Sequence, residues 1–166
     1  MNKPLLLAGL FALPFHVQAA GAHVHGAGKL DITMDRGTIT LQLELPLDAA
    51  VGFEHAPKND TEKAALVAAE KALNSPALFV PTPAANCTAQ PAKIAMPVFD
   101  GKQGGDAHAD IDATHVFHCT SPAALKSVET GIFKSFKRLY RIEVQRVGPA
   151  GQGAARLTPK NPVLAW

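Results

Sequence analysis

The chain has 166 residues, of which 16 are basic and 14 are acidic, so its formal net charge is +2. This near balance provides no basic surface of the kind that binds nucleic acid, and we expect no nucleic-acid partner. The length is typical of one domain that is large enough to bury a hydrophobic core.

The N-terminal residues predict export from the cytoplasm. Lys3 gives a short positive start, residues 4–17 are almost wholly apolar, and small residues including Ala19 follow. This order is typical of a secretory signal peptide, and the apolar stretch is too short for a comfortable membrane span. We therefore expect a signal peptide at residues 1–19, cut after Ala19 or one residue later, and a periplasmic domain at residues 20–166 without a membrane span.

Two histidines open the predicted mature chain, His23 and His25 in the sequence His-Val-His-Gly. On an extended segment their side chains point the same way, with Cβ atoms about 6.5 to 7 Å apart, so one ion could bridge them. Incidental histidines are also common at a flexible new N-terminus. The pair alone therefore does not establish a metal site.

Residues 29–45 predict a β-hairpin. Apolar and polar side chains alternate on both sides of the turn dipeptide Arg36-Gly37. This alternation predicts a sheet with one buried face and one solvent-exposed face. His23 and His25 share the parity of the polar positions, so they lie on the exposed face if the first strand extends backward.

The loop after the hairpin, residues 51–57, places Glu54 beside His55. A carboxylate and an imidazole are both ligands of divalent zinc. The alternative is that His55 only satisfies backbone groups in a tight turn. The adjacent pair taken by itself does not separate the two interpretations.

A helix follows this loop. Asn59 and Glu62 form a start similar to a capping box, and Ser75-Pro76 ends the helix after Asn74. An apolar stripe at helical spacing is interpreted as core packing and not as a cofactor site. The stripe consists of Leu66, Val67, Ala69 and Leu73.

The second half of the chain predicts more strands than helices. Short strands are expected at 77–80 and at 93–98, and Pro97 favours a sheet edge for the second of them. A helix is expected to begin at Ser121-Pro122, with Leu125, Val128 and Ile132 on its buried face. A strand at 139–147, a hairpin arm at 155–158 and a C-terminal segment at 163–166 against the sheet complete the prediction. The predicted fold class is therefore α+β: a single domain, mainly antiparallel sheet with about two helices packed on one face.

The segment 104–119 concentrates imidazole and carboxylate groups. Read with the two-residue period of a strand, its even positions are polar apart from Val116, and its odd positions are apolar apart from His115. We therefore expect one long strand with candidate metal ligands on one face and His115 on the apolar face. The candidate ligands on this strand are Asp106, His108, Asp110 and His118.

One strand cannot build the site alone. At about 3.3 Å per residue, His108 and His118 are roughly 33 Å apart, so they cannot share one ion. Any site must take ligands from other segments. The alternative is a solvated acidic sheet face with incidental histidines.

The chain has two cysteines, Cys87 and Cys119, which are 32 positions apart. An exported protein enters an oxidising compartment, so we expect a single disulfide between them. The alternative is a thiolate metal ligand. Two isolated cysteines lack the paired spacing of a zinc knuckle, which favours the disulfide.

Several of these pieces occur together: His-Val-His-Gly at 23–26 after a signal peptide, Gly-Phe-Glu-His-Ala-Pro at 52–57, the two spaced cysteines, and Ile-Phe-Lys-Ser-Phe at 132–136 before a strand. In this order they resemble the ZrgA-like family. The resemblance implies a periplasmic zinc-binding protein that is produced under zinc limitation and assists a zinc importer. Family members commonly carry a long insertion rich in His, Asp and Glu ahead of the second cysteine, whereas here the matching place holds three histidines.

The leading hypothesis is a non-catalytic periplasmic protein that binds Zn2+ and assists zinc acquisition or buffering. Its candidate ligands are His23, His25, His55, His108 and His118, with Asp106 and Asp110 as secondary donors. Three or four of them must converge around one ion. Binding requires deprotonated imidazole, so it should weaken below about pH 6 to 6.5.

Three alternatives remain open. A zinc hydrolase would use the same histidines with Glu54 as a base, but the chain has no His-Glu-x-x-His or Gly-x-Ser-x-Gly motif, so we do not expect an enzyme. A copper-binding periplasmic protein is the second alternative, because an N-terminal His-x-His also suits copper(II). The third is a metal-free envelope interaction or scaffold protein.

Overall fold

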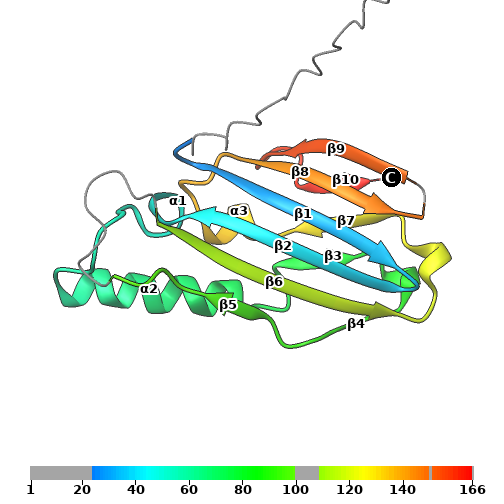
Figure 1. The fold of residues 1–166 in the computed structure, drawn as a ribbon, viewed down its shortest axis with the longest axis horizontal. Helices are drawn as coiled ribbons and strands as arrows, with labels where there is room; N and C mark the ends of the chain where they lie inside the picture. Colours follow the sequence, from blue (N-terminus) through cyan, green and yellow to red (C-terminus); the bar gives the residue numbers. More distant parts are fainter. Residues whose placement is uncertain (1–23, 100–108, 150, 166) are drawn as a thin grey trace, which may run out of the picture.

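The computed structural model describes residues 24–99, 109–149 and 151–165 (Figure 1). These residues form two sheets, three α-helices and two short 3-10 helices. Their bounds are β1 Ala27–Asp35, β2 Thr38–Pro46, α1 Leu47–Val51, α2 Asp60–Leu73, β3 Phe79–Pro81, η1 Pro83–Ala85, β4 Cys87–Ala89, β5 Lys93–Ala95, β6 Asp110–Cys119, η2 Pro122–Ala124, β7 Ser127–Thr130, α3 Ile132–Ser135, β8 Arg141–Gly148, β9 Gly151–Leu157 and β10 Val163–Ala165.

The large sheet has the strand order β4-β6-β2-β1-β8-β9, and β5 also pairs with β6. Neighbouring strands are antiparallel except β1 and β8, which run parallel. The small sheet has the order β10-β7-β3 and lies behind the large sheet in Figure 1. Buried side chains from both sheets and from all three helices form one hydrophobic core. The predicted fold class, an α+β domain with a mainly antiparallel sheet, is confirmed.

The predicted hairpin is present as β1 and β2. Ile32 and Leu41 are opposite each other and both are buried, as the alternation requires. Arg36 and Gly37 connect the strands with φ angles of 43° and 83°. Positive φ at both central residues is the backbone of a tight two-residue hairpin turn. The local turn signal therefore fixes the register of the whole hairpin.

The predicted first helix is present as α2. The Asn59 side chain accepts a hydrogen bond from the Glu62 N–H at 2.9 Å, as the capping pattern predicted. Ala69 and Leu73 are buried, but Val67 is exposed, so its place in the buried stripe is wrong. A residue that follows a stripe position by one is rotated about 100° around the helix, which takes Val67 to the solvent side.

The second predicted helix is wrong. Pro122–Ala124 form only a short 3-10 helix, and Ser127–Thr130 are strand β7 of the small sheet. Leu125 and Val128 are buried as predicted. Buried positions three and four residues apart suggested a helix, but β-branched residues favour a strand, and pairing with β3 and β10 decides between the two.

The long strand predicted at 104–119 is observed from Asp110 onward as β6. Its odd positions are buried, and its even positions are half-buried or exposed. The predicted positions before 109 lie outside the described residues. Cys119 at the end of β6 pairs with Cys87 of β4, and the two form a disulfide.

The remaining strand predictions are confirmed with shifted ends. β5 stops at Ala95, two residues before Pro97, and lies at the edge of the large sheet. β8 and β9 form the last hairpin, in which the second arm begins earlier than predicted, at Gly151. The C-terminal segment joins the small sheet as β10.

Candidate metal centre

A turn at the start of β1 presents His25. The Ala27 N–H donates to the Val24 carbonyl at 2.9 Å, and Gly26 has a φ of 70°. Positive φ at this position of a β-turn favours glycine. A Cβ at Gly26 would also lie 2.5 Å from a carbon of the Tyr140 ring, so only glycine fits. The first strand therefore does not extend backward to His25, and the turn sets the direction of its side chain.

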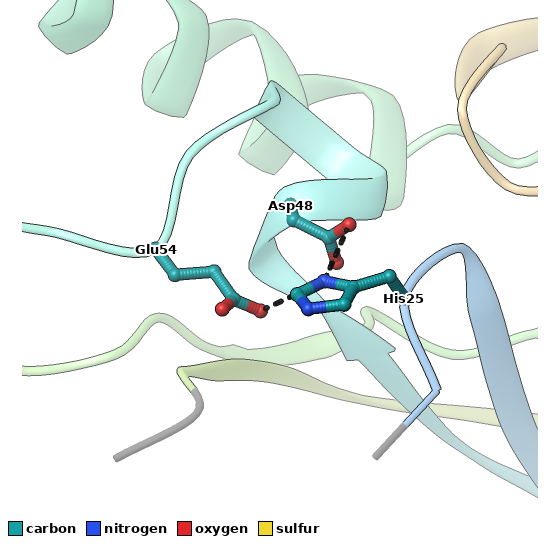
Figure 2. Close-up of side chains that lie close together, drawn as sticks. All are labelled: His25, Asp48 and Glu54. Carbon is teal, nitrogen blue, oxygen red and sulfur yellow. Dashed lines mark ion pairs between the residues drawn. The ribbon is translucent and has the colours of Figure 1, made fainter. Parts of the chain in front are cut away.

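Asp48 belongs to α1, the short helix that follows β2. Both of its neighbours in sequence are buried, whereas the Asp48 side chain points toward the His25 turn (Figure 2). The helix ends at Gly52, which has a φ of 91° and donates its N–H to the Asp48 carbonyl at 2.9 Å. Glycine takes this left-handed conformation without a Cβ clash. The chain then turns, and Glu54 comes to lie beside the same site.

The three side chains converge at one end of the large sheet (Figure 2). His25 Nδ1 lies 3.1 Å from Asp48 Oδ2 and 3.9 Å from Glu54 Oε1. One ligand atom of each residue lies within 4.8 Å of those of the other two. In the described ranges, no other three His, Cys, Asp or Glu side chains come together in this way. We call these three residues the His25 cluster.

The carboxylates of the cluster are more buried than its imidazole. The exposed fraction of the side chain is 67% for His25, 23% for Glu54 and 15% for Asp48. Asp48 Oδ1 is buried and has no hydrogen-bond partner among the described residues. Leaving such a group unpaired costs about 1 to 3 kcal/mol. The oxygen that faces His25 is Oδ2, and a cation held by this carboxylate would offset part of the cost of burying its charge.

The donor set fits zinc. Zn2+ takes imidazole nitrogen and carboxylate oxygen at about 2.0 to 2.2 Å in a tetrahedral array, so two ligand atoms on one ion are about 3.3 to 3.6 Å apart. The observed separations from His25 Nδ1, 3.1 and 3.9 Å, lie on either side of this range, and the ligand atoms of the two carboxylates lie within 4.8 Å of each other. The described residues supply three ligands, so the fourth position of the tetrahedron is left for a further ligand. The cluster can therefore hold an ion that exchanges with solvent through the exposed imidazole side.

His55 is adjacent to Glu54 but is not a member of the cluster. Its Nδ1 lies 2.9 Å from the Ala56 carbonyl and 3.9 Å from Glu62 Oε2, and its ring stacks on Phe53 with centroids 5.1 Å apart. These contacts agree with the alternative interpretation from the sequence, in which His55 satisfies backbone groups in a tight turn. The histidine helps to shape the loop that ends at α2.

His118 and Asp110 occupy opposite ends of β6. His118 Nδ1 lies 3.1 Å from Thr38 Oγ1, beside the turn of the hairpin. Asp110 pairs with Pro46, two residues before Asp48, but does not belong to the cluster. Because the eight residues from Asp110 to His118 span about 26 Å, His118 cannot share an ion with the cluster.

His115 faces the core, as its parity predicted. It is 7% exposed, and its ring meets Phe79 edge to face with centroids 5.0 Å apart. Desolvation by burial lowers the pKa of His115 below its ordinary value. This histidine is therefore a neutral core residue at physiological pH, and it is not a member of the His25 cluster.

The predicted ligands His23, Asp106 and His108 lie outside the described residues. Among the predicted ligands, the structure brings His25 into a cluster and leaves His55, Asp110 and His118 out of it.

Sequence reasoning missed Asp48 and considered Glu54 only as a partner of His55 or as a base. A signal for Asp48 was present in the hairpin. The register pairs Lys29 with Glu44, and continuing it by four residues on each strand places His25 opposite Asp48. The register indicates only that the two residues leave the hairpin at the same end, and the turn at Gly26 and the start of α1 then bring their side chains together.

A family model described as ZrgA family zinc uptake protein matches residues 22–166, which is most of the chain. The match confirms the family resemblance predicted from the sequence motifs. A search of curated proteins gives no match. Of the helices in the described residues, none is long and apolar enough to cross a membrane.

Proposed function

The chain belongs to the ZrgA family of zinc uptake proteins, and from this premise we propose that it is exported to the periplasm and binds Zn2+ through His25, Asp48 and Glu54. In this proposal the protein assists zinc acquisition or buffers zinc, and it catalyses no reaction. The observation that carries the proposal is the convergence of one imidazole and two carboxylates from two separate segments.

The exposure of the cluster supports a role in transfer. A zinc ion held only for structure is closed off by four protein ligands, whereas the described residues supply this cluster with three ligands, one of them an exposed imidazole. A protein that assists uptake must release its ion to a recipient such as the periplasmic component of an importer. An open coordination position gives the recipient a place to attach its own ligand before the ion leaves.

The role of Glu54 supports binding without catalysis. In a zinc hydrolase, a carboxylate that acts as a base must reach a zinc-bound water and is not itself a ligand. Here Glu54 Oε1 lies 3.9 Å from His25 Nδ1. A carboxylate oxygen of Glu54 is thus close enough to the ligand atoms of His25 and Asp48 to bind the same ion. We therefore assign Glu54 to holding the ion.

The donor set also bears on the choice between zinc and copper. Copper(I) prefers soft sulfur ligands, but both cysteines of the chain are in a disulfide. Two oxygens and one imidazole nitrogen suit zinc, while copper(II) binds most nitrogen and oxygen sites more tightly than zinc does. Zinc and copper(II) should therefore be titrated side by side.

Competition titration of the mature protein against a chromophoric chelator tests the proposal. We expect His25→Ala, Asp48→Asn and Glu54→Gln each to weaken Zn2+ binding by at least about tenfold to a hundredfold, the range found even for partners outside the ligand shell. His118→Ala is the matched control, because its imidazole lies at the other end of the sheet, and it should bind as the wild type does. Equal affinity in all four variants would overturn the assignment of the site.

A further inference from the structure

We propose that residues 138–140 act as a clamp that sets the spacing between His25 and the two carboxylates, and that Arg138 is a positioning residue for metal binding. We call this segment the 138–140 clamp. The inference rests on the proposed function, because it concerns the same cluster. It explains how two chain segments that share no covalent link near the site keep their ligands within reach of one ion.

One side of the clamp holds the turn that carries His25. The Tyr140 N–H donates to the Gly26 carbonyl at 2.9 Å. The Tyr140 ring and the Arg138 carbonyl cover Gly26 so closely that a Cβ there would lie 2.5 and 2.8 Å from them. The residue next to the histidine is therefore fixed by a hydrogen bond and by a tight contact.

The other side of the clamp holds α1, which carries Asp48. Arg138 Nε donates to the Asp48 carbonyl at 3.1 Å. The same guanidinium lies over Gly52, where a Cβ would be 3.5 Å from Nε. Arg138 is thus hydrogen-bonded to the Asp48 backbone and lies close to Gly52, where α1 ends and the chain turns toward Glu54.

The clamp is anchored in the core. Leu139 lies between its two contact residues and is 1% exposed. Because one short segment with a buried centre touches both ligand segments, it relates their positions more directly than the sheet does. A ligand set that is held in place before the ion arrives loses less conformational entropy on binding.

Because Arg138 is positively charged, the direction in which Zn2+ affinity changes on its removal tests the proposal. If the guanidinium acted only through its charge, it would repel Zn2+, and removing it would tighten binding. If it acts by position, removing it weakens binding although a positive charge has been lost. The two effects are opposite, so the direction of the change distinguishes them.

The experiment compares Arg138→Met with Lys137→Met in the mature protein. Methionine keeps a flexible, unbranched apolar stem but is shorter than arginine or lysine, and it removes both the charge and the hydrogen-bond donors. Lys137 is an exposed neighbour, so its replacement removes the same charge close by. We expect Arg138→Met to weaken Zn2+ binding about 10- to 100-fold, as loss of a partner outside the ligand shell does. Lys137→Met should change the affinity by less than about threefold, because exposed charges are screened at physiological salt.

The absorption spectrum of bound Co2+ is a second measurement that a purely structural role would not change. It reports the coordination geometry, so a shifted ligand set should alter it in folded Arg138→Met protein while Lys137→Met keeps the wild-type spectrum. Arg138→Lys keeps the charge and most of the side chain, so it serves if the methionine variant does not fold. We expect it to bind more weakly than wild type, since an ammonium group lacks the planar guanidinium whose Nε donates to the Asp48 carbonyl.

Failure of the clamp and failure of the proposed function have different results. If His25→Ala weakens binding but Arg138→Met and Arg138→Lys both bind as tightly as wild type or tighter, only the clamp is overturned. If His25→Ala binds as the wild type does, the site itself is wrong and the clamp falls with it.

Discussion

A histidine lies beside each end of the β1–β2 hairpin, His25 before β1 and His118 on the neighbouring strand β6, and their surroundings contrast. At the open end, His25 faces Asp48 and Glu54, two carboxylates that are mostly buried. At the turn end, His118 meets only the Thr38 hydroxyl among the contacts described, and the Cys87–Cys119 disulfide closes the chain next to it. The same residue type is thus a candidate ligand at one end and a surface residue at the other.

The difference follows from which elements meet at each end. At the turn end, a two-residue connection joins the strands, and the Cys119 N–H at the end of β6 donates to the Gly37 carbonyl. At the open end, the chain leaves β2 into α1 and returns past Gly52, so a helix and a loop are added to the turn that holds His25. A histidine becomes a candidate ligand here because the turn before β1 meets the segment of α1 and the loop after it, which places an imidazole and two carboxylates at one point.

The largest effect we expect comes from opening the disulfide at the turn end. Replacing both Cys87 and Cys119 by alanine removes a cross-link over 32 positions. The chain-entropy model gives a loss of about 3 to 4 kcal/mol in the free energy of unfolding for a loop of this length. Urea denaturation of the oxidised wild type and of the double variant measures the loss.

Measuring the zinc affinity of the same double variant tests whether the two ends of the hairpin are independent. The disulfide lies near the opposite end of β6 from the cluster, so folded double variant should bind Zn2+ within about threefold of wild type. A much larger loss of zinc affinity would mean that the two ends are energetically coupled and cannot be treated as independent regions.

The next effect concerns pH and compares two histidines on the same strand. Because burial lowers the pKa of His115 in the folded protein, the unfolded chain takes up a proton first as the pH falls. The part of the free energy of unfolding that depends on a neutral His115 is therefore fully present above the unfolded pKa of about 6.5. It is lost as the pH falls from that value to the lower pKa of the folded protein. The slope in this window reaches about 1.4 kcal/mol per pH unit.

Unfolding free energies measured across this pH window for two variants check the assignment. His115→Leu removes the titrating group from the core and should flatten the dependence on pH. His118→Ala changes an exposed histidine three residues further along β6 and should keep the wild-type slope. A slope that persists in His115→Leu would assign the pH dependence to other groups.

Local signals predicted most of the fold. The Arg36-Gly37 turn fixed the hairpin, the Asn59 cap fixed the start of α2, and alternation along β6 placed His115 inside. Each of these depends on residues close together in sequence. The stretch around Val128 failed because its burial pattern fits a helix or a strand, and pairing with two distant strands decides between them.

The candidate site was predicted only in part, for the same reason. His25 was found because it stands in a His-x-His pair at the predicted mature N-terminus, which also fits a family motif, whereas Asp48 has no distinctive local pattern. Its role depends on the pairing of β1 with β2 and on the return of the chain at Gly52. Arg138 is further still in the sequence, and its contact with the Asp48 carbonyl follows only from the packing of the 138–140 clamp.

The smallest effect we expect tests a local signal that lies close to the site. Asn59 accepts a hydrogen bond from the Glu62 N–H and begins α2, five residues after Glu54. Asn59→Ala should cost about 1 kcal/mol in the free energy of unfolding, the usual price of an N-cap. Asn59→Asp restores the acceptor and should recover most of that loss, since aspartate caps as well as asparagine does.

Because the cap fixes the loop between Glu54 and the helix, Zn2+ affinity should follow the same order among the three proteins, with only a few-fold spread. If Asn59→Ala lowers stability and leaves zinc affinity unchanged, the helix start does not help to position Glu54, and the geometry of the open end depends on the hairpin, Gly52 and the clamp alone.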